Sequence, residues 1–373
     1  MIIVIADDIT GAAEIAGIAF SHGLQTRLVT STVAPLADCD VLVVATDTRS
    51  MPQAEAIREI RRVSEWVSAV CPSSVIFHKV DSALRGHVMV ELSVLMSSLG
   101  YKRALYIPAN PSKGRIISGG VYAINGLSLD KTEFANDPEF PITTAVLESR
   151  FEGMKRWCVD AFEGIYYADA ESADDMQRYV DEAPQGTLLA GAADMFTALL
   201  QSLGLCVGNV TAAVGGLTDG STLIICGSTQ SQSLASFDYI VRNGIVTSMM
   251  PLDVFQSQVP LTAWSERIMQ VYLDSRSLIL AIPHYTSSQP IQKAAYLRRV
   301  MSYTVGELIR VSPPHELIIE GGATAYSVLQ TIGWSEFVIT AEVSPGVVRM
   351  QTPSGDYVTL KPGSYPWGQL FGE

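Results

Sequence analysis

Short apolar runs without alternation recur along the first part of the chain, and each is followed by a polar or glycine-containing turn and a helical repeat. The runs are Ile2–Ala6, Arg27–Thr30, Val41–Ala45, Val75–His78 and Ala104–Ile107. Strands buried on both faces of a parallel sheet have this continuous apolar character, because helices cover both sides of such a sheet. The pattern predicts an α/β fold in which a mainly parallel sheet is flanked by helices.

The sequence between these runs predicts helices. One helix follows the first run and stops near Gly23, and another extends from about His87 to Leu99 and ends at Gly100. The apolar stretch Leu188–Leu217 is broken by polar residues and predicts a core helix plus a loop. Turn residues crowd Ala109–Asp137, which indicates either a long loop that covers a ligand or a structural hairpin.

The same strand-to-helix pattern resumes near Ser221. It gives predicted strands at Thr222–Cys226, Ser277–Ile282 and Leu317–Glu320, the last leading into a helix through Ile332. A chain of 373 residues exceeds what one hydrophobic core usually serves. The stretch 208–220 is rich in glycine, which is typical of a domain boundary. We therefore expect two domains, 1–215 and 216–373, with the active site in the cleft between them.

Composition narrows the classes of partner. A net charge of -13 disfavours nucleic acid, because phosphodiester backbones repel an acidic surface. The five scattered cysteines predict buried, reduced thiols, and the N-terminus lacks a basic segment and a long apolar run. We therefore expect a cytoplasmic protein that does not enter a membrane. The five histidines show no metal spacing, and we predict neither a zinc site nor a hydrolase triad.

Asp7 and Asp8 follow the first predicted strand and precede a helix. The carboxyl ends of parallel strands form the edge where open α/β sheets bind ligands. Asp8 could accept a proton from a substrate hydroxyl at this edge. The alternative is that Asp8 or Thr10 only caps the helix, which explains one aspartate but not the second.

Two more predicted strands end in paired acidic and basic residues. Asp47 and Arg49 follow Val41–Ala45, and a run beginning at Lys79 follows Val75–His78, with Asp81, Ser82 and Arg85 in it. A planar guanidinium suits bidentate capture of a carboxylate, so this edge is typical of a site for a hydroxylated acid. Alone, Arg85 and Asp81 are better explained as an ion pair at i, i+4.

Glycines mark two strand-to-helix turns in the second half of the chain. Gly321 and Gly322 precede Ala323 and Thr324, and Gly227 precedes Ser228. Glycines at a helix N-terminus let backbone N–H groups approach a phosphate, although a tight turn is the better explanation of Gly321 and Gly322 taken alone. Two such turns in one domain and an acid-binding edge in the other favour phosphoryl transfer.

These motifs together resemble the four-carbon acid sugar kinase family. The resemblance is carried by Asp7–Ala12, Asp47–Ser50, Lys79–Gly86, Pro108–Arg115, Gly227–Ser228 and Gly321–Ala325. It implies an enzyme of carbohydrate metabolism that transfers a phosphoryl group from ATP, with Mg²⁺, to the 4-hydroxyl of threonate, erythronate or 3-oxo-tetronate. It assigns the base to Asp8, the sugar acid to Asp7, Asp47, Arg49, Lys79, Asp81, Ser82, Arg85 and Arg115, and ATP to Ser228, Gly321, Gly322, Ala323, Thr324 and Gly363.

The chain departs from the family pattern on the nucleotide side. The family has an acidic residue where this chain has Ala323, and the glycine-rich C-terminal motif is altered after Lys361. A sensor that binds a sugar acid without turnover is therefore an alternative to the kinase. A different transferase on the same scaffold is a third reading, because a fold does not determine function. The magnesium ligands, the particular acid and a homodimer are left open.

Overall fold

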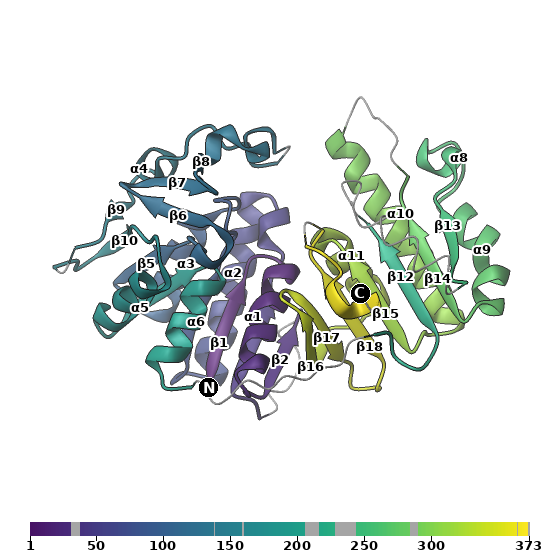
Figure 1. The fold of residues 1–373 in the computed structure, drawn as a ribbon, viewed down its shortest axis with the longest axis horizontal. Coiled ribbons are helices and arrows are strands. Elements are labelled where there is room, and N and C mark those ends of the chain that lie inside the picture. Colours follow the sequence, from purple (N-terminus) through teal and green to yellow (C-terminus); the bar gives the residue numbers. More distant parts are fainter. Residues whose placement is uncertain are drawn as a thin grey trace. The chain divides into compact units, whose positions relative to one another are not determined.

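The structure is a computed structural model that describes residues 1–30, 38–137, 139–158, 160–205, 216–227, 244–283, 290–363 and 365–371. It divides into two compact units, Met1–Val210 and Thr211–Glu373, and each contains both strands and helices (Figure 1). The predicted α/β class is confirmed. The assignment of sugar acid to the first unit and nucleotide to the second stays a prediction.

The sheet of the first unit is parallel throughout. Its strands run in the order β2-β3-β1-β4-β11-β5-β10-β9, so the first strand of the chain lies near the middle. Both β1 and β3 are buried along their whole length, as their continuous apolar sequences predict. The strands are β1 (Ile2–Ala6), β2 (Thr26–Val29), β3 (Val41–Ala45), β4 (Val75–Lys79), β5 (Arg103–Ile107), β9 (Lys155–Arg156), β10 (Gly164–Tyr167) and β11 (Thr187–Gly191).

Helices cover both faces of this sheet (Figure 1). On one face α1 (Ile9–Ser21) contacts α6 (Ala193–Ser202), which contacts α5 (Ala173–Glu182). On the other face α2 (Gln53–Val70) packs against α3 (Val88–Leu99). The helix α4 (Leu147–Arg150) is a single turn.

The turn-rich segment after β5 forms a small antiparallel sheet, so the hairpin alternative is confirmed. It contains β6 (Arg115–Ser118), β7 (Val121–Ile124) and β8 (Leu127–Ser128). Short 3₁₀ turns precede and follow this sheet, at Pro111–Lys113, Leu129–Lys131 and Glu133–Asn136.

The sheet of the second unit is mixed. Parallel strands in the order β13-β14-β12-β15-β18 continue into β17 and β16, which are antiparallel. The strands are β12 (Thr222–Cys226), β13 (Val246–Met249), β14 (Ser277–Ala281), β15 (Glu316–Glu320), β16 (Glu336–Ser344), β17 (Val347–Gln351) and β18 (Tyr357–Lys361). The helices are α8 (Leu252–Phe255), α9 (Ala263–Asp274), α10 (Pro290–Val311) and α11 (Gly322–Ile332).

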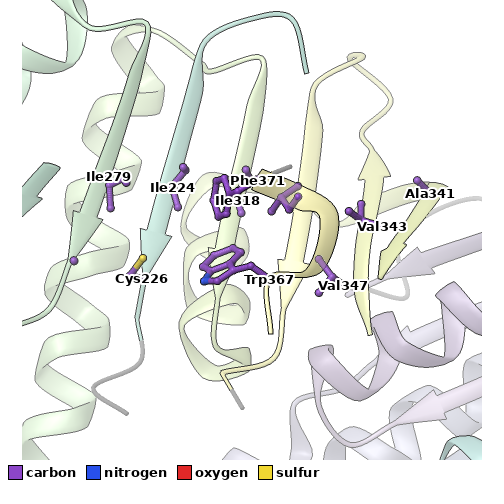
Figure 2. Packing of buried hydrophobic residues seen from close by; sticks show 11 residues of the cluster. Ile224, Cys226, Ile279, Ile318, Ala341, Val343, Val347, Trp367 and Phe371 are labelled. Atoms are coloured by element: carbon purple, nitrogen blue, oxygen red, sulfur yellow. The ribbon is translucent and has the colours of Figure 1, made fainter. Parts of the chain in front are cut away.

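The C-terminal residues complete the core of the second unit. Figure 2 shows Trp367 and Phe371 in one apolar cluster with Ile224, Ile279 and Ile318 from three parallel strands. The 3₁₀ turn Gly368–Phe371 thus covers sheet surface that would otherwise expose apolar side chains to water.

Three sequence-based expectations need correction. Leu188–Leu217 was expected to begin with a helix, but its first residues belong to β11, and α6 starts only at Ala193. Buried thiols were expected, but Cys158 is exposed, while the other cysteines within the described ranges are buried or partly buried, and all of these are free. The antiparallel strands β16 and β17 were not expected. No helix in the described ranges is long and apolar enough to cross a membrane.

Candidate functional site

The order of strands in the first unit brings the loops that follow three neighbouring strands together. The central strand β1 pairs with β3 on one side and β4 on the other, and Ala6 lies level with both Ala45 and Lys79. Chain connections diverge on either side of β1, which makes its carboxyl end a topological switch point. The residues that follow β1, β3 and β4 therefore meet at one edge of the sheet, and they include Asp7 and Arg49.

Asp8 is held by several donors. Its Oδ1 accepts a hydrogen bond of 3.0 Å from the backbone N of Gly11, so it caps α1 as the capping alternative proposed. Its Oδ2 accepts from the Thr10 hydroxyl and pairs with Arg49 Nη2. These partners outweigh the desolvation caused by burial, and the pKa of Asp8 is lowered.

Asp7 is a carboxylate like Asp8, but it has far fewer hydrogen-bond donors around it. It is 2% exposed, and its Oδ1 is buried without a hydrogen-bond partner among the described residues. The Nη1 atom of Arg49 lies 3.9 Å from Asp7 Oδ2. Burial raises the pKa of Asp7 to about 7, partly offset by Arg49.

Both arginines predicted to capture the acid are held by carboxylates of the protein. Arg49 Nη1 donates to Asp81 Oδ1 at 3.0 Å, in addition to its pairing with Asp8. Arg85 forms two hydrogen bonds of 2.9 Å with the Asp81 carboxylate, and its Nη1 reaches Asp137 Oδ2 at 3.2 Å. The expected pair at i, i+4 is thus present, and burial of Asp81 is outweighed by the arginines, so its pKa is well below its usual range.

Lys79 points toward the start of α1. Its Nζ donates to Val80 O at 2.9 Å and lies 3.7 Å from Glu14 Oε2. A Cβ added at Gly11 would lie 3.0 Å from this Nζ and 2.7 Å from Asp8 Oδ1. The glycine therefore allows the ammonium group and the Asp8 carboxylate to approach the helix start from either side.

Side chains from the small antiparallel sheet bind the loop after β4. Arg115 donates to the backbone oxygen and the hydroxyl of Ser82, and the Tyr122 hydroxyl donates to the same backbone oxygen. Arg150 Nη2 donates to Leu84 O at 3.3 Å. Arg115 and Arg150 donate to backbone oxygens and to a hydroxyl, and neither guanidinium group has a carboxylate partner among the described residues.

Two residues of this site have left-handed backbone conformations that cost energy for residues with a side chain. Asp47 has φ 55° and Leu84 has φ 60°, and Leu84 is fully buried. Such conformations cost about 1–3 kcal/mol and persist where the surrounding structure holds them. Asp47 Oδ1 accepts a hydrogen bond of 3.4 Å from the Ser50 hydroxyl.

A buried polar network lies behind the aspartates. His78 contacts Glu91 Oε2 through Nε2 and the backbone oxygen of Ile5 through Nδ1, each at 3.0 Å. The Thr46 hydroxyl donates to Ala6 O at 2.8 Å and is 3.0 Å from the Thr48 hydroxyl. These contacts hold the last two residues of β1, directly before Asp7.

The second unit contains the predicted phosphate-binding turns. Gly321 has φ 96° and precedes α11, while Gly322 is the first helical residue. The prediction that both glycine N–H groups face a ligand is wrong for Gly321, because its N–H donates to Lys361 O at 2.9 Å. The first N–H groups of the helix, from Gly322 to Thr324, have no partner within the helix and can face a ligand.

Gly227 lies against the same helix start. A Cβ added there would be 2.2 Å from the Thr324 hydroxyl oxygen, so no other residue fits without movement. Ser228 lies outside the described residues. Gly363 is described, partly buried, and follows β18.

A buried ion pair lies beside these turns. Lys361 Nζ is 2.6 Å from Glu320 Oε1, both side chains are 0% exposed, and the ammonium lies 4.7 Å from the centre of the Trp367 ring. Glu320 immediately precedes Gly321, so the pair fixes the end of β15 to that of β18.

Sequence reasoning missed several residues that contact the first site. They are Glu14, Tyr122, Phe134, Asp137 and Arg150. Glu14 carried a usable signal, because it is a carboxylate within the apolar face of the first predicted helix. The other four come from β7, from the turns after it and from the short helix α4, whose spatial positions have no local sequence signal.

The chain is similar in sequence to a known protein family and to known kinases. Residues 2–162 match the family described as "Sugar-binding N-terminal domain". The chain is 30% identical to D-threonate kinase of Salmonella typhimurium over 53% of this chain and 52% of that enzyme. It is 26% identical to 3-oxo-tetronate kinase of Brucella melitensis over 92% of this chain and 88% of that enzyme. D-erythronate kinase of Heliobacterium modesticaldum is 29% identical over 38% of this chain and 33% of that enzyme.

Solved structures share the fold along the whole chain. A Salmonella typhimurium LT2 structure superposes with TM-score 0.76 and 21% identity, covering 99% of this chain and 97% of that one. Haemophilus influenzae protein HI1011, of the family named DUF1537, gives TM-score 0.71 and 19% identity over 99% and 98% of the two chains. At these identities the likeness concerns the fold.

Proposed function

The chain belongs to the family that includes the D-threonate, D-erythronate and 3-oxo-tetronate kinases, and from this premise we propose that it phosphorylates the 4-hydroxyl of a four-carbon sugar acid with ATP. The protein is a phosphotransferase that acts on an alcohol group. The finer assignment to a four-carbon acid and to ATP is our proposal.

The observation that carries the proposal is the group of charged side chains at the switch point of the first unit. Carboxylates of Asp7, Asp8 and Asp81 surround Arg49, and Arg85 joins the same cluster through Asp81. A hydroxylated acid needs acceptors for its hydroxyl groups and cations for its carboxylate, and this edge offers both.

Charge compensation divides the basic residues into two groups. Arg49 and Arg85 are neutralised by carboxylates of the protein, whereas Arg115 and Arg150 donate to neutral oxygens and have no carboxylate partner among the described residues. An incoming carboxylate is attracted most by a cation that is not already neutralised. We therefore assign capture of the acid to Arg115 with help from Arg150, and the orientation of hydroxyl groups to the Arg49 and Arg85 cluster.

The nucleotide is proposed to bind the second unit. The N-terminus of α11 supplies unpaired N–H groups for a phosphate, and Gly227 keeps the neighbouring turn free of a side chain. Thr324, which is buried beside Gly227, would contribute a hydroxyl there.

Mg²⁺ is proposed to enter with the phosphates. In nucleotide sites this ion is usually held by one or two carboxylates together with the substrate phosphates, where it offsets their negative charge. No group of three or more metal-binding side chains occurs in the ranges that the structure describes, so the residues present suit an ion of this shared kind rather than a protein-built cage. Its ligands are not assigned.

Turnover with a panel of acids tests the proposal. D-threonate, D-erythronate and 3-oxo-tetronate are each incubated with Mg-ATP, ADP release is followed, and the product is located by phosphorus NMR. We expect a 4-phosphate from at least one acid, loss of acid binding in Arg115→Ala, and no change in Arg178→Ala, whose partner Asp175 lies on the exposed helix α5. Acid binding without ADP release would favour a sensor that binds the acid without turnover. This alternative is suggested by Ala323, which stands where the family has an acidic residue. No binding of any acid would exclude both functions.

A further inference from the structure

We propose that Asp7, rather than its neighbour Asp8, accepts the proton of the substrate hydroxyl during phosphoryl transfer. This inference rests on the proposed kinase function and concerns which carboxylate of the pair performs it. The family resemblance favoured Asp8. The contacts of the two side chains favour Asp7.

Asp8 is already occupied with local structure. One oxygen caps α1 through Gly11 N, and the other accepts from Thr10 and pairs with Arg49. To accept a proton, Asp8 would have to weaken these interactions, each of which favours the ionised form. A carboxylate with three donors is therefore a poor proton acceptor and a good structural anchor.

Asp7 has an acceptor atom that nothing in the described structure uses. Its Oδ1 is buried without a hydrogen-bond partner, and a buried unpaired acceptor costs about 1–3 kcal/mol. The hydroxyl of a bound substrate would supply the missing donor. Gly86 passes close by, since a Cβ added there would lie 3.4 Å from Asp7 Oδ2, so the loop after β4 can cover the carboxylate without a side chain in between.

The charged groups around Asp7 match this role. Arg49 and Lys79 favour its ionised form, Asp8 and Glu91 disfavour it, and burial disfavours it most. The pKa of Asp7 is consequently raised to about 7, which is near the value that suits a general base at neutral pH.

Phosphoryl transfer to the acid exchanges one bond at phosphorus for another. The 4-oxygen of the acid forms a bond to the γ-phosphorus of ATP while the bond from that phosphorus to the bridging oxygen breaks, and ADP leaves with the electron pair. The hydroxyl proton moves to Asp7 Oδ1 and is later lost to water. Asp8 meanwhile keeps Arg49 and the start of α1 in place.

Two isosteric variants separate the aspartates. We expect Asp7→Asn to lower kcat by about 10²–10⁴-fold, the usual contribution of a general base, while D-threonate still binds in calorimetry. We expect Asp8→Asn to keep at least about a tenth of kcat, because asparagine also caps helices well. In the wild type and in Asp8→Asn, kcat/KM should fall as pH drops below about 7. The pH profile of Asp7→Asn should lack this decrease, which we call the acidic limb.

Two results would overturn the assignment. One is an Asp7→Asn enzyme that keeps more than a tenth of kcat. The other is an Asp8→Asn enzyme that is correctly folded, binds the acid and has lost both kcat and the acidic limb. A wild-type protein without ADP release for any acid would instead defeat the proposed function itself, and the proton acceptor with it.

Discussion

Asp7 and Asp81 lie in one site, yet their pKa values move in opposite directions. Asp81 accepts from the backbone N of Ala83 and Arg85 and from both arginines. Asp7 has an oxygen without a hydrogen-bond partner among the described residues, and only the more distant charges of Arg49 and Lys79 favour its ionised form. Burial is similar for both, so the difference comes from the number of donors. Asp81 anchors the loop after β4, and Asp7 is left poorly stabilised as an anion.

The raised pKa of Asp7 should be visible in how the stability of the protein depends on pH. Its pKa is raised from 3.8 to about 7 on folding, so the folded state holds this proton more tightly, and the contribution of Asp7 to stability falls as pH rises between these values. Asp7→Asn should therefore gain stability relative to wild type between pH 4.5 and pH 8, by about 3 kcal/mol at about 1.4 kcal/mol per pKa unit, because part of the shift lies below pH 4.5. Urea denaturation at the two pH values measures this. A difference that is the same at both would contradict the raised pKa.

Asp81 gives the opposite expectation. Its pKa is lowered on folding, so its stabilisation is present above the unfolded value of 3.8 and is lost as pH falls below it. Asp81→Asn should destabilise the protein by about 3–5 kcal/mol at pH 7, because it leaves buried cations uncompensated. The loss should shrink toward pH 3. An equal loss at both pH values would show that shape, not charge, is what Asp81 provides.

Asp137 should compete with the substrate for the arginines. Its carboxylate occupies Arg85 Nη1, the terminal nitrogen that Asp81 leaves free, and Phe134 lies beneath the guanidinium with its ring centre 5.3 Å away. Asp137→Asn should tighten sugar-acid binding by about 2–5-fold, the scale of one partly exposed ion pair, and less at high salt. Asp169→Asn, near exposed Arg156, is the control. Weaker binding in Asp137→Asn would make Asp137 a ligand of the hydroxyl groups instead.

At the scale of elements, the buried parallel strands could be predicted from sequence and the edges of the fold could not. β1, β3 and β12 have the predicted bounds, because continuous apolar runs allow no other placement. β11 was missed because Thr187–Gly191 runs directly into the apolar helix α6, so that the two read as one segment. The loop residues of the site follow from strand ends, but Arg150 and Asp137 depend on tertiary contacts.

The two glycine turns of the second unit should respond differently to alanine. At Gly321 an added Cβ meets nothing within 4 Å, so Gly321→Ala carries mainly the backbone cost of φ 96°, about 1–2 kcal/mol. At Gly227 the Cβ would collide with Thr324, so Gly227→Ala should cost more and should weaken ATP binding, with sugar-acid binding unchanged. Thermal shifts with each ligand measure both. Equal ATP-induced shifts in wild type and Gly227→Ala would place the nucleotide elsewhere.

Removing one partner of the Lys361 and Glu320 ion pair should lower the stability of the protein far more than replacing both partners with apolar residues. Removing one partner leaves a buried charge, so Lys361→Met should destabilise the protein by about 3–5 kcal/mol. The double variant with Glu320→Leu should recover much of this loss. A double-mutant cycle in urea tests the prediction, and additive losses would show that the two side chains act independently.

At the scale of the whole molecule, the division into two units separates the two proposed ligands. Fold class and the existence of two units follow from chain length and the repeated strand-to-helix pattern, whereas the antiparallel extension of the second sheet does not. A pattern of β-branched residues in β16 and β17 indicates strands but does not determine which neighbour they pair with.

The C-terminal turn has a consequence for the order of biosynthesis. The strands of the first unit lie within Met1–Val210, so this unit can fold while the ribosome is still translating the second, at ~5–20 residues per second. The second unit cannot close its core until residues 367–371 have been translated, because Trp367 and Phe371 cover strands that precede them in the chain. Before that point a nascent chain would carry a folded first unit together with an open apolar sheet, which is the kind of surface that chaperones bind and that a stop codon between β18 and Trp367 would leave exposed.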